Sequence, residues 1–283
     1  MKFVTISTHR TPNFEIFEQS AKYHDISFDI LGEGQRYTGH ACKTSWLIDY
    51  LADLDSGEIV LYTDSYDAFF LAGEDEILRK YQKRNVPLLF SAEQNLNQDG
   101  GMFQKWSVYQ GLQKGVKPYQ YLNAGGYIGR AGYIRKLLEK TLDWEVSDQS
   151  SFNTYFAQSG EALHLDDENE IFSCTAGRTG LETWDYRAKN DRLVNKHTGA
   201  KPCIIHFAAK NFRGANILLS QISYLQERRY DEREQPQYNW YKFKNRLIDL
   251  SCQDNYLFHL TIHSSAVLAA IIVLCYFLLQ QFG

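Results

Sequence analysis

The chain has 283 residues, of which 44% are hydrophobic, so it can bury a large core in one catalytic-sized domain. Its formal net charge of −4 argues against nucleic acid as the main partner, because binding to a phosphate backbone favours a basic surface. The five cysteines are scattered and lack a C-x-x-C spacing, which argues against a disulfide framework or a zinc site and fits a reducing compartment.

The first eight residues read as a strand-like run that is too short and too polar to be the hydrophobic region of a secretory signal. The run contains Thr5 and leads into a polar loop that starts at Thr8. This loop either faces a nucleotide at the end of the first strand or is an ordinary polar turn. Residues 27–31 read as a second strand, and the glycine-rich loop after it lacks the spacing of a dinucleotide-binding or P-loop motif.

A helix is predicted over residues 42–54, where apolar side chains recur at helical spacing. Lys43 lies near its start, as either a phosphate contact or a solvated charge. The buried strand that follows, residues 59–62, leads to Asp64 and Asp67. In open α/β sheets ligands bind beyond the carboxyl ends of the strands, and a carboxylate pair there suits Mg²⁺ or Mn²⁺ completed by substrate phosphates. Taken alone, this spacing is equally typical of a turn or a helix cap.

The next segments continue the alternation of strands and helices. A helix is predicted over residues 74–84, a strand over 86–93 and a loop over 95–105. Gly125 and Gly126 then separate two strand-like pieces within residues 121–129, which indicates positive φ or a ligand against the backbone. Further helices are predicted over residues 133–142 and 149–158.

The acidic segment 165–170 is predicted to be a solvated turn between short strands at 163–165 and 171–174, with Asp166 retained as a functional candidate. A last strand, residues 202–207, contains His206 near its end. A lone histidine of this kind is usually structural. Two carboxylates and an imidazole at one sheet edge would nevertheless make an open site for Mn²⁺.

Six short segments follow one another along the chain, namely residues 63–67 (TDSYD), 88–93 (LLFSAE), 122–129 (LNAGGYIG), 147–149 (SDQ), 171–172 (IF) and 205–206 (IH). In this order they resemble the glycosyltransferase domain of the procollagen lysyl hydroxylases and the related collagen glycosyltransferases. The resemblance covers residues 1–214, and the set of segments is far more specific than any single one.

The resemblance implies a GT-A fold, an α/β Rossmann-like domain with a mostly parallel central sheet that binds a UDP-sugar. Mn²⁺, or Mg²⁺, would bridge the diphosphate, held by Asp64, Asp67 and His206. Tyr66 would stack on the uracil, and Asn123 and Asp148 would reach the sugar hydroxyls. The other positions implied near the donor are Thr5, Thr8, Lys43, Gly125, Gly126 and Lys210.

The chain departs from the family pattern in three places. The aspartate run before the Asp-Gln pair is reduced to Glu145-Val146-Ser147-Asp148, an Asp-His pair is replaced by Asp166-Asp167, and the loop after the histidine is Phe207-Ala208-Ala209-Lys210-Asn211. The sugar pocket is therefore expected to differ, and collagen does not follow as the acceptor. Asp148 and Asp166 are the catalytic candidates, with Asp167 as a further candidate base. The sequence leaves retention or inversion open.

The predicted function is transfer of a hexose such as glucose or galactose from a UDP-sugar to a hydroxyl group of a protein or glycan. Two alternatives stay open. A phosphohydrolase with a strand-end aspartate as nucleophile usually has a second carboxylate two residues on, where this chain has Tyr66. A catalytically inactive membrane adaptor would keep the fold and bind the donor without turnover.

The expected domain organisation is a transferase domain over residues 1–225, a charged and aromatic linker over 226–254 and a C-terminal membrane anchor over 255–283. An amphipathic helix is predicted over residues 216–227. The uncharged last span is long enough as a helix to cross a hydrocarbon core of ~30 Å. Its most apolar part, 266–279, could instead pack within a homodimer or lie partly buried. Lys242, Lys244 and Arg246 precede the span, which predicts a single-pass protein with the catalytic domain on the cytoplasmic side.

Overall fold

The computed structural model describes residues 1–116, 118–175, 182–208, 210 and 212–234, together with six residues between 264 and 272. Strands and helices alternate along the chain, as expected for an α/β domain. The helices are α1 (Pro12–Tyr23), α2 (His40–Ala52), α3 (Glu74–Arg84), α4 (Met102–Gly111), α5 (Ala131–Thr141), α6 (Asp148–Ser159) and α7 (Phe212–Leu219). The strands are β1 (Lys2–Ile6), β2 (Asp29–Leu31), β3 (Ile59–Thr63), β4 (Ala68–Phe70), β5 (Leu88–Glu93), β6 (Tyr121–Arg130), β7 (Phe172–Cys174), β8 (Tyr186–Lys189), β9 (Arg192–Asn195) and β10 (Ile204–His206).

The central sheet has five strands in the order β2-β1-β3-β6-β5. β1 is parallel to β2 and β3, whereas β6 is antiparallel to both β3 and β5. The expectation of a mostly parallel sheet is therefore corrected to a mixed sheet. The reason is the connection after β5, which brings the chain back to the edge of the sheet where β5 ends, so that β6 starts there and runs in the opposite direction. At that edge the Gln120 amide donates to the Glu93 carbonyl at 3.1 Å. The predicted glycine-separated pieces form one continuous strand, β6.

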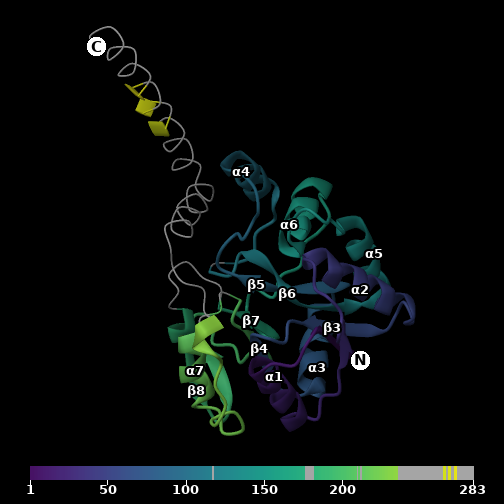
Figure 1. Cartoon of the computed structure of the whole chain (residues 1–283), viewed down its shortest axis with the longest axis vertical. Coiled ribbons are helices and arrows are strands. Elements are labelled where there is room, and N and C mark those ends of the chain that lie inside the picture. The colour runs from purple at the N-terminus through teal and green to yellow at the C-terminus, as the bar shows by residue number, and fades with distance from the viewer. Residues whose placement is uncertain are drawn as a thin grey trace.

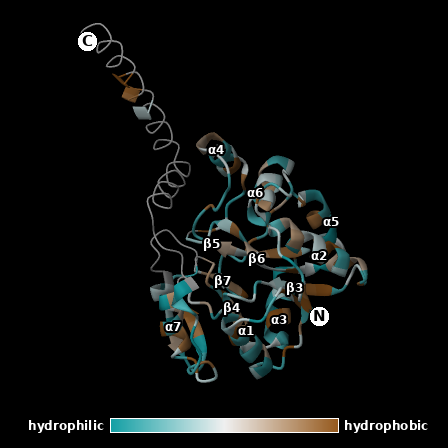
Figure 2. Cartoon of the chain, in the orientation of Figure 1, coloured by the Kyte–Doolittle hydropathy of each residue, from teal (hydrophilic) through white to brown (hydrophobic). Residues whose placement is uncertain are grey.

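Helices cover both faces of this sheet, with α2, α5 and α6 on one side and α1 and α3 on the other (Figure 1). Strand side chains alternate between the two sides, because successive residues of a strand point in opposite directions. In β3, for example, Val60 and Tyr62 pack on the first side and Leu61 on the second. In Figure 2 the strands are largely hydrophobic in colour and the outer helices mixed, as expected for a sheet buried on both faces.

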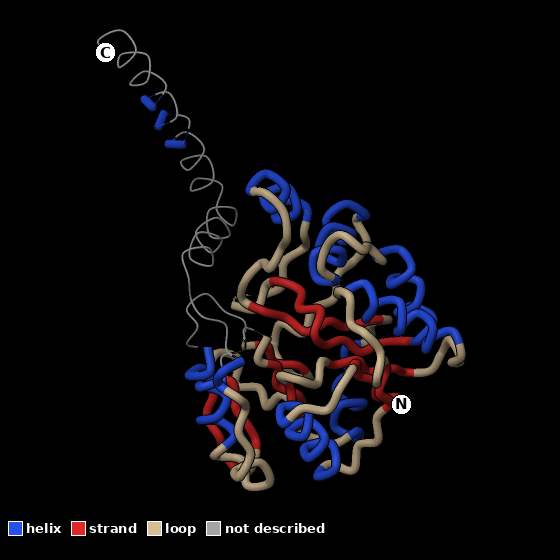
Figure 3. The backbone as a smooth tube through the Cα atoms, viewed as in Figure 1, coloured by secondary structure: helices blue, strands red, loops and turns tan. Residues whose placement is uncertain are grey.

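A smaller three-stranded sheet, β4-β10-β7, lies beside the central one (Figure 3). β10 is antiparallel to β4 and parallel to β7. A third apolar cluster joins this sheet to α7 and to the β8–β9 hairpin, and includes Phe69, Ile205, Phe207 and Leu219. α7 covers Phe212–Leu219, so the helix predicted over residues 216–227 was wrong in its bounds.

The predicted membrane anchor, residues 255–283, falls outside the described residues apart from six positions, as does most of the predicted linker. Within the described part of the chain, no helix combines the length and apolar character needed to span a bilayer.

Substitution of Leu61 tests the packing of the central sheet, because this side chain is fully buried at the centre of β3. We expect Leu61→Ala to lower the free energy of unfolding by about 2–5 kcal/mol, since the lost methyl groups leave a cavity between the sheet and its α1/α3 side. Urea denaturation measures this change. Ile217→Ala, at a half-exposed position of α7, is the control and should change stability by less than about 0.5 kcal/mol. Equal effects of the two substitutions would contradict this core assignment.

Candidate active site

The link between the two sheets brings the predicted metal ligands together. Asp64 and Asp67 lie in the short connection from β3 to β4, and His206 is the last residue of β10, paired in register with Ala68 of β4. The His206 Nε2 atom lies 3.2 Å from Asp67 Oδ1 and 3.7 Å from Asp64 Oδ2. One ligand atom from each residue fits within a 4.8 Å cluster. His206, which is far from Asp64 and Asp67 in sequence, thus joins them in one compact donor set.

A hydrogen bond to Asn123 orients the His206 imidazole so that it can coordinate a metal ion. His206 Nδ1 lies 3.1 Å from the side-chain oxygen of Asn123, so the Nδ1 proton can be donated to Asn123 and Nε2 faces the carboxylates. Burial lowers the pKa of His206, but the Asp67 carboxylate outweighs this and raises it well above the ordinary value. A divalent cation between these groups would take the place of that proton. Two carboxylates and an imidazole form a donor set suited to such an ion.

Gly125 completes the cradle around the donor set. A Cβ atom at this position would lie 2.1 Å from the His206 ring and 2.8 Å from Asp64 Oδ2. The glycine is therefore required by close approach of the ligands to the backbone of β6. The Asp64 amide also donates to the Gly125 carbonyl at 2.9 Å, which fixes the first ligand against the same strand.

Lys43 supplies positive charge next to the donor set. Its ammonium group lies 3.0 Å from Asp64 and 2.8 Å from Asp148, and 5.0 Å from the centre of the Tyr62 ring. Burial raises the pKa of Asp64, but Lys43 and His206 outweigh this and lower it to about 2. Asp148 also lies 3.4 Å from His40 Nδ1. Lys43 is thus a buried structural cation between two aspartates rather than a solvated charge.

These groups line a cavity of about 720 Å³. It gathers most of the predicted site residues, namely Thr8, Lys43, Asp64, Tyr66, Asp67, Asn123, Gly125, Asp148, His206 and Lys210. Tyr66 is held at its wall because its hydroxyl donates to the His9 carbonyl at 2.8 Å. Lys210 reaches the cavity from a backbone with a φ of +51°.

The structure does not bring the other three predicted residues into this cavity. Thr5 is buried, and its hydroxyl donates to the Thr63 carbonyl at 2.7 Å. Gly126 faces Phe172, where a Cβ atom would approach the ring to 2.9 Å. Thr5 and Gly126 therefore serve packing between strands rather than ligand contact.

Asp166, predicted as a catalytic candidate, is a buried structural carboxylate. Its two oxygens accept hydrogen bonds from the backbone amides of Glu170, Ile171 and Phe172 at 3.1, 2.7 and 2.7 Å. Burial raises its pKa to about 6, although these three amides favour the ionised form. The acidic segment is thus a tight turn built around Asp166, and the expectation of a wholly solvated turn is corrected.

The sequence reasoning did not select Glu93, which is fully buried behind the cavity wall and holds two of its lining residues, Asn123 and Gln149. Its carboxyl group accepts from Gln149 at 2.5 Å, Asn97 at 2.8 Å and Asn123 at 3.4 Å. Burial raises its pKa to about 7 despite these bonds. Its place as the last residue of a buried strand was a signal for a site residue, since Asp64 lies just past the end of β3, which runs in the same direction on the other side of β6. The lining residues that the sequence reasoning did not select include His9, Tyr37, His40, Asp99, Lys105 and Gln149.

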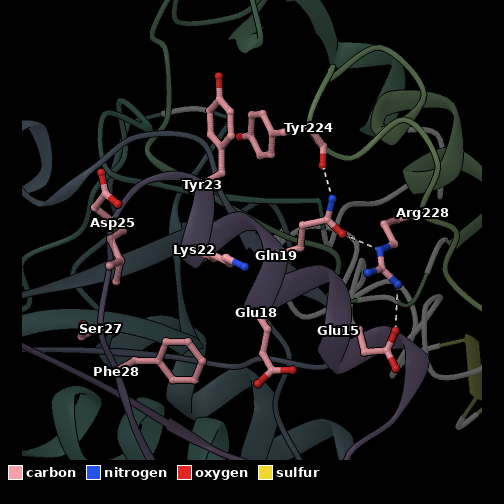
Figure 4. Close-up of a pocket in the computed structure, with 11 residues that line it drawn as sticks. Glu15, Glu18, Gln19, Lys22, Tyr23, Asp25, Ser27, Phe28, Tyr224 and Arg228 are labelled. Carbon is pink, nitrogen blue, oxygen red and sulfur yellow. Dashed lines mark hydrogen bonds and ion pairs between the residues drawn. The ribbon is translucent and has the colours of Figure 1, made fainter.

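A second, more open cavity of about 1010 Å³ lies along α1 (Figure 4). Three of its charged groups are paired within the protein, since Arg228 contacts Glu15 at 2.8 Å and Glu18 pairs with Arg10. Tyr23 and Tyr224 stack with ring centres 3.8 Å apart. These contacts attach the segment after α7 to α1.

The fold and the site are those of an α/β domain with a carboxylate–imidazole centre at the sheet edge. The chain belongs to the PLOD GT domain family, whose model matches residues 1–230. It is 27% identical over 221 residues to procollagen-lysine,2-oxoglutarate 5-dioxygenase 2 of Mus musculus, a match covering 72% of this chain and 29% of that protein. It is 26% identical over 221 residues to the multifunctional procollagen lysine hydroxylase and glycosyltransferase LH3 of Rattus norvegicus, with the same coverage.

The chain thus spans only about three-tenths of the length of these two relatives. Among solved structures, a glycosyltransferase involved in glycosylation of the major capsid of PBCV-1 is similar with a TM-score of 0.45 and 13% identity. That match covers 77% of this chain and 98% of the other. It is too weak to establish a common fold by itself.

Gly125→Ala tests the geometry of the donor set. The added methyl group should displace the His206 ring and weaken Mn²⁺ binding by about 10- to 100-fold, as loss of ligand orientation does in other metal sites. Calorimetric titration with Mn²⁺ measures the affinity. Gly101→Ala, where a Cβ meets no atom within 4 Å, is the control. Wild-type affinity in the Gly125 variant would contradict the arrangement described above.

Asp166→Asn tests whether Asp166 is structural. The amide can accept at only one atom and turns a donor toward a backbone amide, so we expect a loss of about 1–3 kcal/mol in unfolding free energy. Urea denaturation measures it. Glu168→Gln, whose side chain is 65% exposed, is the matched control and should change stability by less than about 0.5 kcal/mol. A variant as stable as the wild type would refute the role of Asp166 in the turn.

Proposed function

We propose that this chain is a glycosyltransferase that moves a hexose from a UDP-sugar to a hydroxyl acceptor on a protein or glycan, with Mn²⁺ or Mg²⁺ as cofactor. The observation that carries the proposal is the Asp64–Asp67–His206 donor set at the wall of a cavity large enough for a nucleotide-sugar, in a member of the PLOD GT domain family. The name of the LH3 relative includes glycosyltransferase activity, which supports the same reaction class.

The cation would be held by Asp64, Asp67 and His206, and when bound it would offset the negative charge that develops on the departing diphosphate. Lys210 reaches the same cavity and is proposed as a further diphosphate contact. Lys43 acts indirectly. Because its charge is shared between Asp64 and Asp148, it holds both carboxylates in place.

The nucleoside and the sugar would be bound by different walls of the cavity. Tyr66 is proposed to stack on the uracil, with Thr8 beside it. Asp148 is proposed to accept hydrogen bonds from sugar hydroxyls, because Lys43 and His40 fix its orientation.

Asn123 is proposed to position His206 rather than to bind the sugar. Its oxygen already faces His206 and accepts from the Gly125 amide at 3.1 Å, and its amino group donates to Glu93. With both ends of the amide engaged, Asn123 connects Glu93 to the proposed metal ligand.

We also propose the domain organisation that the sequence predicts. We propose that the transferase domain covers residues 1–225, that 226–254 form a linker and that 255–283 anchor the chain in a membrane from the cytoplasmic side. Packing of residues 266–279 within a homodimer is the alternative. A phosphohydrolase is disfavoured because Tyr66 occupies the position where that chemistry usually has its second carboxylate.

UDP binding and UDP-sugar turnover test the proposed function. The full chain should bind UDP in the presence of Mn²⁺ and lose this binding with a chelator, because the diphosphate needs the cation. Asp64→Asn and Asp67→Asn should each lower release of UDP from UDP-glucose or UDP-galactose by at least about 100-fold. Calorimetry and a UDP-release assay give the two measurements.

Asp49→Asn is the matched control for these variants, because Asp49 is exposed on α2 and does not line the cavity. Two results would refute a metal-dependent transferase. One is full activity of both site variants. The other is release of inorganic phosphate without cleavage of the bond to the sugar.

A further inference from the structure

The two oxygens of Asp64 have different partners. Oδ1 accepts from the Lys43 ammonium group at 3.0 Å and from the Tyr62 hydroxyl. Oδ2 faces the donor set, since it lies 3.7 Å from His206 Nε2 and 2.8 Å from the position of a Cβ atom added at Gly125. One oxygen of Asp64 is therefore held by the protein, and the other is turned toward the site of the proposed cation.

Tyr62 reaches Asp64 because of its place in β3. Side chains two residues apart on an extended chain lie on the same face of a sheet, and the Asp64 amide still bonds to the Gly125 carbonyl of the neighbouring strand. Tyr62 packs on the side of the sheet that α2 covers, and Lys43 reaches Asp64 from α2 on that same side. The order Tyr62-Thr63-Asp64 thus places a phenol beside the first ligand as a consequence of strand geometry.

The Tyr62 ring is fixed by its packing. It is fully buried, and it stacks on Tyr127, its register partner in β6, with ring centres 4.9 Å apart and planes 30° apart. The Lys43 ammonium group lies 5.0 Å from the ring centre. Among the described residues, the Tyr62 hydroxyl has a hydrogen bond to Asp64 and to no other group. The position of this hydroxyl is therefore set by the sheet, and the position of Asp64 Oδ1 follows from it.

We propose that Tyr62 is a positioning residue that restricts Asp64 to one coordinating oxygen, Oδ2, and thereby favours Mn²⁺ over Ca²⁺ in the site. This inference rests on the proposed function, because it concerns the cation of that reaction. Two donors on Oδ1 keep the carboxylate from turning both oxygens toward the cation. Ca²⁺ takes more oxygen ligands than a smaller octahedral ion does, and it often uses both oxygens of one carboxylate. An octahedral ion can use one oxygen from each carboxylate.

Lys43 alone does not account for this orientation. Its ammonium group also contacts Asp148 at 2.8 Å, so its charge is shared between two carboxylates. Lysine presents a point charge on a flexible stem, whereas the Tyr62 hydroxyl is carried by a stacked ring and serves Asp64 alone among the described residues. The phenol is therefore the group that fixes the rotation of the Asp64 carboxylate.

Tyr62→Phe in the full chain tests the proposal, because it removes one hydroxyl and keeps the ring that stacks on Tyr127. Calorimetric titration with Mn²⁺ should show an affinity lower by about 10-fold or more, as expected when a ligand loses the hydrogen bond that orients it. The affinity for Ca²⁺ should stay within about threefold of the wild-type value, since this ion tolerates flexible ligand geometry. The wild type should bind Mn²⁺ more tightly than Ca²⁺, and the variant should lose most of this preference.

Tyr81→Phe is the matched control. Tyr81 is buried on α3, does not line the cavity, and donates its hydroxyl to the Val86 and Pro87 carbonyls at 2.8 and 3.2 Å. This variant loses the same hydroxyl and should bind both ions as the wild type does. Urea midpoints measured with a chelator show how much stability each variant loses. A residue that only stabilises the strand would weaken binding of both ions equally and leave the preference for Mn²⁺ unchanged.

Three results would overturn the inference. The first is wild-type Mn²⁺ affinity in Tyr62→Phe, the second is an equal loss of affinity for both ions, and the third is a wild type that binds Ca²⁺ as tightly as Mn²⁺. Each leaves the proposed function intact if the wild type binds Mn²⁺ and releases UDP from a donor. A folded wild type that binds neither ion, alone or with UDP, overturns the proposed metal-dependent transfer, and this inference with it.

Discussion

The site depends on one structural constraint, which is that the connection between β3 and β4 belongs to two sheets at once. At its start the Asp64 amide donates to the Gly125 carbonyl of the central sheet. At its end the Asp67 carbonyl accepts from the Phe207 amide, just after β10 of the smaller sheet, at 2.7 Å. Because β4 pairs in register with β10, His206 must lie opposite this connection. The backbone hydrogen bonds of the two sheets therefore set the distances between the three donor groups.

The second requirement is electrostatic, because several acidic groups are crowded around a largely buried cavity. Lys43 separates Asp64 from Asp148, and His206 lies between the two members of the Asp64–Asp67 pair. Glu93 lacks a cationic partner at hydrogen-bond distance in the described structure, and burial raises its pKa to about 7. Glu93 holds Asn123 and Gln149 from behind the cavity wall, where its burial disfavours a further negative charge. The site thus separates ionised carboxylates near the proposed cation from a carboxyl group that serves as scaffold.

The parts of this arrangement that the sequence predicts are those with a local pattern. The run from Ile59 to Thr63 and the charges of Glu74–Arg84 gave elements close to the observed β3 and α3. The strand-end positions of Asp64, Asp67 and His206 then located one edge of the sheet. The direction of β6 has no local signal, since a strand reads the same in either orientation, and the mixed sheet was missed for that reason. The first residues of α4 were also predicted as part of a loop over residues 95–105, because glycine and polar residues precede its Met102 start.

The roles of individual acids were hidden in the sequence for a related reason. Asp166 and Asp99 both occur in polar segments, and only tertiary contacts separate them. Asp166 turns inward, and three backbone amides use both of its oxygens. Asp99 turns toward α6, where two serines and one amide use a single oxygen. A carboxylate with both oxygens engaged can stabilise only its own turn, whereas one with an unengaged oxygen at a cavity wall can still act on a ligand. The count of partners per oxygen, which no sequence pattern encodes, is therefore what separates a structural acid from one with an oxygen left for a ligand in this fold.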